Sequence, residues 1–180
     1  MISPRMQDAL NEQIRNEFYS SFAYLSMSAH FEHQNLPGFA TWMRVQAGEE
    51  HVHAMKIFDH VLDRGGEVKM PAIAQPPVKF ESAVSVFEQA LLQERAVTKS
   101  IHDLYALAME TKDYPARVFL DWFVNEQVEE EKTAELIVEQ LRMVGDDRPA
   151  LLLLDRELGQ RKGDGGGDHK KKKRDDGHHG

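Results

Sequence analysis

The sequence lacks cysteine altogether, and this absence excludes several classes of site. Without thiols the chain cannot form disulfides, zinc–thiolate sites, iron–sulfur clusters or a cysteine nucleophile. A cysteine-free composition also suits a reducing cytoplasm, where we expect the protein to act. Long apolar runs are missing too. No segment approaches the roughly 20 apolar residues that a membrane-spanning helix requires, so we expect no membrane partner.

What remains is an acidic chain of ordinary globular composition. Lys and Arg number 22 against 30 Asp and Glu, which gives a net charge of −8. This balance disfavours nucleic acid as a partner and suits the binding of cations. With 180 residues, 41% of them hydrophobic, the chain can form one domain, which we place at residues 1–160. Residues 161–180, rich in Gly, Lys, Asp and His, are predicted to be a disordered tail, and a metal- or anion-binding role for that tail stays open.

Apolar residues recur at every third or fourth position along five segments, which is the helical pattern. The predicted helices cover residues 4–33, 38–62, 81–110, 115–143 and 149–158. Short turns join the first helix to the second and the third to the fourth, so each pair should form an antiparallel hairpin. Residues 65–79 contain Gly-Gly and Pro-Pro and show no helical pattern. Because about 15 extended residues reach about 50 Å, this link can run the length of a bundle. The sequence therefore predicts an all-α four-helix bundle with one long crossover and a short fifth helix.

Polar residues interrupt the inward faces of the four long predicted helices. Each face carries a glutamate near its middle, and the second helix adds a histidine: Glu17, Glu50, His53, Glu94 and Glu130. A helix advances by about 1.5 Å per residue, and the distances of these residues from the short turns agree. We therefore expect the five side chains to meet at one level of the bundle.

A weak internal repeat supports this grouping. Glu17 precedes Glu50 by 33 positions, and Glu94 precedes Gln127 by the same number. Each second member is followed three residues later by a further candidate ligand, His53 or Glu130, on the same helix face. Each half of the chain thus supplies one acid and then an i, i+3 pair.

Four carboxylates buried together favour a metal site. Without a cation they would repel one another, lose hydration and take up protons. Two Fe²⁺ ions would balance the four charges, and carboxylates with a single imidazole are suitable ligands for iron. The alternative is a structural bundle without metal, in which each acid is merely solvated or salt-bridged. The convergence of five candidate ligands on four helix faces disfavours that alternative.

Several motifs give the chain a resemblance to a known family. They are Leu10-Asn11-Glu12-Gln13 ahead of Glu17, Glu49-Glu50-x-x-His53, Glu94, and Glu126-Gln127-x-Glu129-Glu130-Glu131-Lys132. On these residues the chain resembles the ferritin family, specifically its haem-free bacterial members, over residues 1 to about 160. The implied fold is the ferritin-like four-helix bundle with one long crossover and a short C-terminal helix.

The resemblance also implies the roles of the central residues. Glu17, Glu50 and His53 would hold a first iron, and Glu50 would bridge to a second iron completed by Glu94 and Glu130. This di-iron centre is implied to be a ferroxidase site, which oxidises Fe(II) to Fe(III) with O2 or H2O2.

Five further residues match functional positions of the family. Gln127 would lie beside the iron pair as a hydrogen-bonding residue, and Tyr24 would donate an electron or trap a radical. Tyr24 can equally be a core tyrosine with a bonded hydroxyl. Glu49, Glu126 and Glu129 match a third iron site leading to the interior, although the same acids can simply form an exposed face.

Departures from related families narrow the resemblance. A bacterioferritin would be expected to carry a second Glu-x-x-His where this chain has Gln127-x-x-Glu130, and a haem-binding methionine where it has Val52. We therefore expect no haem. The absence of cysteine argues against a rubrerythrin.

The implied assembly is a homo-oligomeric shell of 24 subunits that stores ferric oxyhydroxide. The run Leu151-Leu152-Leu153-Leu154 would pack around a fourfold axis of that shell, or would instead fold back on its own bundle. The alternative function is a di-iron peroxidase or oxidase that does not store iron.

Overall fold

The computed structural model describes residues 1–163, and within that range the regular structure is entirely helical. The helices are α1 Pro4–His33, α2 Pro37–Asp63, α3 Ala83–Glu110, α4 Tyr114–Val144 and α5 Arg148–Leu158. The expected all-α architecture is confirmed, and every helix end lies close to its predicted position. The predicted tail lies outside the described residues from residue 164 onward. None of the helices described is long and apolar enough to cross a membrane.

Side-chain caps explain where four of the helices begin. A serine or aspartate ahead of the helix accepts a hydrogen bond from a first-turn backbone N–H in α1, α3, α4 and α5: Ser3, Ser82, Asp113 and Asp147. Such caps satisfy N–H groups that have no partner within the helix. The exception is α2, because its preceding residue Leu36 makes no side-chain hydrogen bond.

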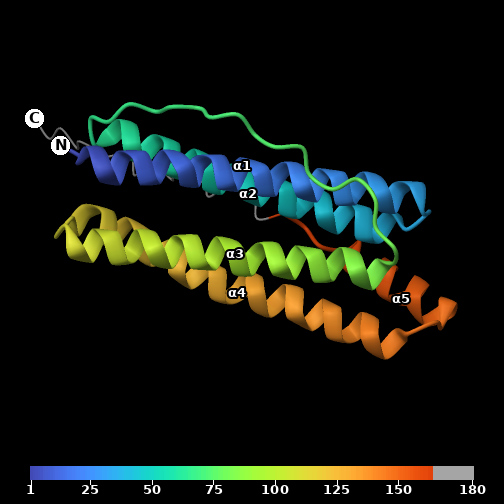
Figure 1. Ribbon diagram of the computed structural model, residues 1–180. Helices are drawn as coiled ribbons and strands as arrows, with labels where there is room; N and C mark the ends of the chain where they lie inside the picture. Colours follow the sequence, from blue (N-terminus) through green and yellow to red (C-terminus); the bar gives the residue numbers. More distant parts are fainter. Residues whose placement is uncertain (164–180) are drawn as a thin grey trace, which may run out of the picture.

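The helices pair as two antiparallel hairpins (Figure 1). Each hairpin turn contains one residue in the left-handed region, Asn35 with φ 58° and Lys112 with φ 55°. The crossover between the hairpins runs along α1, so that α3 starts at the same end of the bundle as α2 (Figure 1). Asn11 fixes the start of this crossover by bonding the backbone of Glu67 and Lys69, and Ser26 bonds the carbonyl of Pro77 near its end.

The interior contains two apolar cores with a polar layer between them. One core gathers aromatic side chains near α5, including Phe31, Phe39 and Phe87, and we call it the α5-side core. The other, which we call the N-terminal core, includes Leu10 and Ile57. The polar layer consists of buried side chains from all four long helices: Glu17, Gln46, Glu50, His53, Glu94, Gln127 and Glu130.

The short helix α5 supplies the cap that α2 lacks. The buried Asp155 accepts a hydrogen bond through Oδ1 from the backbone N–H of Phe39 at 2.8 Å. Two glycines permit this contact. A Cβ on Gly38 would lie 1.7 Å from the carbonyl oxygen of Asp155, and one on Gly159 would lie 2.8 Å from the Cα of Gly38. The end of α5 is therefore held against the start of α2.

Candidate metal centre

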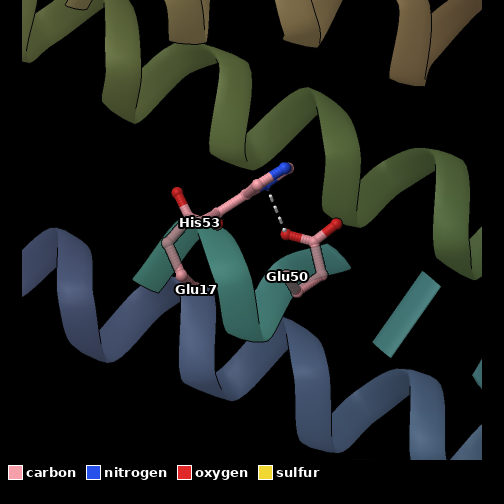
Figure 2. Close-up of side chains that lie close together, drawn as sticks. All are labelled: Glu17, Glu50 and His53. Carbon is pink, nitrogen blue, oxygen red and sulfur yellow. Dashed lines mark ion pairs between the residues drawn. The ribbon is translucent and has the colours of Figure 1, made fainter. Parts of the chain in front are cut away.

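Three of the predicted ligands converge between α1 and α2. Glu17 extends from α1 toward Glu50 and His53, which lie one turn apart on α2 (Figure 2). The three side chains are buried, and one ligand atom from each lies within 4.8 Å of the other two. His53 Nδ1 lies 3.4 Å from Glu50 Oε2 (Figure 2).

One polar atom of each of these three side chains lacks a hydrogen-bond partner within the part of the chain that the structure describes. Glu17 Oε2, Glu50 Oε2 and His53 Nδ1 are buried and have no hydrogen-bond partner among the described residues. Buried polar atoms are rarely left in this state because each unmade hydrogen bond costs about 1–3 kcal/mol. A cation between them would supply the missing interaction, so the arrangement fits a metal.

The other oxygen of each glutamate is already bonded. Gln13 Nε2 donates to Glu17 Oε1 at 2.7 Å, and Gln46 Nε2 donates to Glu50 Oε1 at 3.1 Å. Each glutamine lies one helical turn before the glutamate that it binds. The glutamines hold one carboxylate oxygen in place and leave the other directed at the cluster.

Glu94 on α3 is bonded differently, because protein donors contact both of its carboxylate oxygens. The hydroxyl of Tyr24 donates to Glu94 Oε1 in a buried hydrogen bond. Gln127 Nε2 lies 3.3 Å from Glu94 Oε2 and 3.2 Å from the backbone oxygen of Glu94. Tyr24 and Gln127 thus both contact Glu94 directly.

Glu130 on α4 joins the layer from the opposite side. Its Oε2 accepts a hydrogen bond from Gln46 Nε2 at 2.7 Å. Ligand atoms of Glu130, His53 and the half-buried Glu126 also lie within 4.8 Å of one another. His53 therefore stands between two groups of potential ligands.

Burial raises the pKa of the glutamates in the polar layer. Desolvation, followed by the charge of Glu50, raises the pKa of Glu17 to about 8 and that of Glu130 to about 7. The same two causes raise the pKa of Glu94 well above its ordinary value. For His53, desolvation lowers the pKa, but the contact with Glu50 and the surrounding carboxylates outweigh it and raise the pKa to about 9. Without metal, the layer retains protons at neutral pH.

Beside His53 and Glu130 a cavity of about 530 Å³ opens between α2 and α4. Its walls include Glu49, Glu126 and Glu129, the three acids that resemble a third iron site. Glu49 is paired there with Arg161, from the segment that follows α5. The structure thus brings the predicted site residues to the polar layer or to this adjoining cavity, except Tyr24, which lies in the α5-side core and contacts the layer through Glu94.

Sequence reasoning assigned no function to three residues that contact the predicted ligands. Gln13 and Gln46 had a local signal, since each precedes an inward glutamate by four positions on the same helix face. Arg161 had none, because it lies 112 positions from Glu49.

Buried glutamates on four helices, a histidine and an adjoining acidic cavity give this four-helix bundle a carboxylate-rich layer that fits metal. The ferritin-like domain family matches residues 7–144 of the chain. The chain belongs to the ferritin family.

Individual relatives agree with this assignment. The chain is 38% identical to a bacterial non-heme ferritin of Staphylococcus aureus strain USA300 over 161 residues, which cover 89% of this chain and 97% of the relative. It is 40% identical to the bacterial non-heme ferritin of Staphylococcus epidermidis, with the same coverage. Among solved structures, an open pore ferritin from the archaeon Archaeoglobus fulgidus superposes with a TM-score of 0.89 at 50% identity, covering 90% of this chain and 100% of the other.

Proposed function

We propose that the chain is the subunit of an iron-storage ferritin, which oxidises Fe²⁺ at a di-iron ferroxidase centre and keeps the product as a ferric oxyhydroxide mineral. One observation carries this proposal: the buried atoms Glu17 Oε2, Glu50 Oε2 and His53 Nδ1 lie together without hydrogen-bond partners among the described residues. The names of the relatives, bacterial non-heme ferritins, support the same function and give no reason to expect haem.

Iron is the substrate of this centre. Glu17, Glu50 and His53 would bind the first Fe²⁺, and Glu50 would bridge to a second held by Glu94 and Glu130. Two Fe²⁺ carry four positive charges, which balance the four glutamates once their protons have left. Tyr24 and Gln127 would hold Glu94 through the hydrogen bonds that they already make.

The proposed reaction moves one electron from each Fe²⁺ to a shared oxidant. With H2O2, two Fe²⁺ supply two electrons and solution supplies two protons, so that two waters and two Fe³⁺ result. With O2, the same two electrons and two protons yield H2O2. The glutamates stabilise the rising charge, because hard carboxylate oxygens favour the more highly charged ion. Where an oxidant is left one electron short, Tyr24 would supply that electron and pass its hydroxyl proton to Glu94, to which it already donates a hydrogen bond.

The acidic cavity gives the product a way out of the centre. Glu126 approaches His53 and Glu130 on one side and shares the cavity with Glu49 and Glu129 on the other. We propose that these three acids, Glu49, Glu126 and Glu129, form a third iron site through which Fe³⁺ moves inward.

Storage requires a container, and we propose a homo-oligomeric shell of 24 copies. On α5, Leu152 and Leu153 are 48% and 66% exposed, whereas Leu154 is buried against the bundle. Adjacent exposed leucines on a short helix suit a contact with neighbouring subunits. Leu154 thus packs on its own bundle, which is one of the two arrangements considered from the sequence. Leu152 and Leu153 would make the contact between subunits that the other arrangement requires.

The test is aerobic loading of the metal-free protein with Fe²⁺, followed by measurement of soluble iron and particle size on one sample. We expect hundreds of iron atoms to stay soluble in each shell-sized particle. Saturation near two irons per chain in a small oligomer would refute storage and favour the di-iron peroxidase or oxidase.

A further inference from the structure

Two arginines and a lysine line the acidic cavity, and they differ in what they contact. Arg44 pairs with Glu32 of α1 at 2.8 Å, and Lys56 Nζ lies 4.4 Å from the ring centroid of Trp122. Arg161 instead reaches the acids beside the polar layer. Its position therefore bears on any metal that enters the cavity.

The guanidinium of Arg161 is held by three side chains of α2. One nitrogen, Nη2, donates to Glu49 Oε2, and the other, Nη1, donates to Gln46 Oε1 at 2.7 Å. The guanidinium carbon lies 4.7 Å from the ring centroid of Trp42. Trp42, Gln46 and Glu49 follow one another along a single face of α2, so the arginine lies flat along that helix.

Arg161 is also connected to the polar layer through one glutamine. Because Gln46 Oε1 accepts from Arg161, the amide nitrogen of Gln46 faces the layer and donates to Glu50 at 3.1 Å and Glu130 at 2.7 Å. A fixed positive charge thus stands one side chain away from two proposed iron ligands.

The residues that precede Arg161 anchor it to α2. Asp155 caps α2, and the close contact of Gly38 with Gly159 holds the end of α5 against the same helix. Arg161 follows two residues after Gly159, and its backbone N–H bonds the carbonyl of Leu158. The contacts that fix Arg161 lie only a few residues before it in the sequence. Its pairing with Glu49 therefore follows from how α5 packs on α2.

We propose that Arg161 is a positioning residue that serves as a built-in counter-cation at the exit of the centre. It binds Glu49 while no metal is present, and a metal ion moving from the di-iron centre to the third site must displace it. This inference rests on the proposed function, which supplies the third site of Glu49, Glu126 and Glu129.

Because a metal ion must first displace Arg161 from Glu49, we expect the third site to bind metal more weakly than the other two. A guanidinium on Glu49 competes for the carboxylate and repels a second cation that approaches it. Charge-assisted hydrogen bonds are among the stronger ones, but the side chains of Arg161 and Glu49 are 23% and 20% exposed, so water screens part of the effect. We expect removal of Arg161 to tighten the third site by about tenfold.

The experiment uses Zn²⁺, which does not change its oxidation state, on the full-length assembled protein without iron. Calorimetric titration counts the zinc ions per chain and measures the affinity of each step. We expect two tight sites and a weaker third in the unchanged protein. In Arg161→Ala, only the third should tighten. Arg161→Lys keeps the charge and should leave the third site weak.

Two further variants test whether the effect depends on the pairing of Arg161 with Glu49. Arg44→Ala removes another arginine of the same cavity, one that pairs with Glu32, and should leave all three steps unchanged. Glu49→Gln should weaken the third site, and adding Arg161→Ala to it should then tighten the site by much less than in the unchanged protein. Particle size and thermal midpoint, measured for each variant, identify any that fail to assemble, and Arg161→Gln replaces Arg161→Ala in that case.

The possible outcomes distinguish a failure of this inference from a failure of the proposed function. Absence of two tight zinc sites in the unchanged protein would refute the proposed di-iron centre and the inference with it. Two tight sites, with a third that is the same in Arg161→Ala, would refute only the inference. Weakening of the first two sites in Arg161→Ala would show that the arginine supports the centre through Gln46 and does not compete for the exit.

Discussion

The two hairpins contribute differently to the polar layer. The α1–α2 hairpin brings Glu17, Glu50 and His53 together with three buried atoms that have no hydrogen-bond partner among the described residues. On the α3–α4 hairpin, Glu94 is bonded by Tyr24 and Gln127, and Glu130 is bonded by Gln46. Glutamine donors bond one oxygen each of Glu17 and Glu50, but the first half still retains unbonded atoms for a cation, whereas protein donors bond both oxygens of Glu94 in the second half.

This difference implies an order of binding. A cation at Glu17, Glu50 and His53 must displace protons, but it breaks none of the hydrogen bonds made by Gln13 and Gln46 and contacts atoms that have no hydrogen-bond partner among the described residues. A cation at Glu94 and Glu130 must compete with hydrogen bonds that already exist. We expect the first metal to bind more tightly than the second, and the following changes test that comparison in order of decreasing effect.

Glu50→Ala should have the largest effect, because Glu50 is proposed to contact both metals. We expect the initial rate of Fe²⁺ oxidation, followed by stopped-flow absorbance, to fall by more than about 100-fold. Both tight zinc sites should be lost in calorimetric titration. Glu12→Ala, an exposed change on α1, is the control. Retention of one tight site in Glu50→Ala would mean that Glu17 and His53 suffice without the bridge.

Glu94→Ala should slow oxidation by about 10- to 100-fold yet leave one tight zinc site. The physical reason is that Glu94 belongs only to the second half of the layer. Size-exclusion chromatography should still show the assembled particle, and Glu88→Ala on the exposed face of α3 provides the comparison. Unchanged stopped-flow kinetics would count against the assignment of Glu94 as a ligand.

Raising the pH should strengthen metal binding across the layer. Below their raised pKa values of about 8 for Glu17, 9 for His53 and 7 for Glu130, these groups hold protons that compete with metal. Zinc affinity should therefore rise from pH 6 to pH 9 by about tenfold per pH unit for each proton released, and then level off. Titration in buffers of different ionisation enthalpy counts the protons. An affinity that is constant over this range would contradict the prediction.

Tyr24→Phe should have the smallest effect and should depend on metal. It removes the donor to Glu94 while keeping the buried ring, so we expect the metal-free protein to lose about 1 kcal/mol of stability. With zinc bound, the loss should shrink because metal then contacts Glu94. Thermal midpoints with and without zinc measure both quantities. Tyr105→Phe removes a hydroxyl that donates to Asp121 at an exposed site, and should change neither midpoint.

The sequence was sufficient to predict the helices and the meeting of four glutamates and His53 at one level of the bundle, because both follow from local spacing. An acid near the middle of each inward face, with helices of similar length joined by short turns, leaves little freedom in where Glu17 and Glu94 can meet. Spacing does not reveal hydrogen bonds between distant segments. Asp155 caps α2 across 116 positions, and Arg161 binds Gln46 across 115. These contacts depend on how α5 packs, which no periodic pattern encodes.

The position of the polar layer between two apolar cores also bears on how the hairpins find their alignment. If one hairpin slipped past the other by a single helical turn, about 5.4 Å, most apolar side chains would still meet other apolar side chains. The same slip would move Glu94 away from Tyr24 and Glu130 away from Gln46, into hydrocarbon surroundings where unpaired carboxyl groups are costly. The same acids therefore favour the correct alignment of the two hairpins. A misaligned bundle would leave them buried without hydrogen-bond partners, even in the absence of metal.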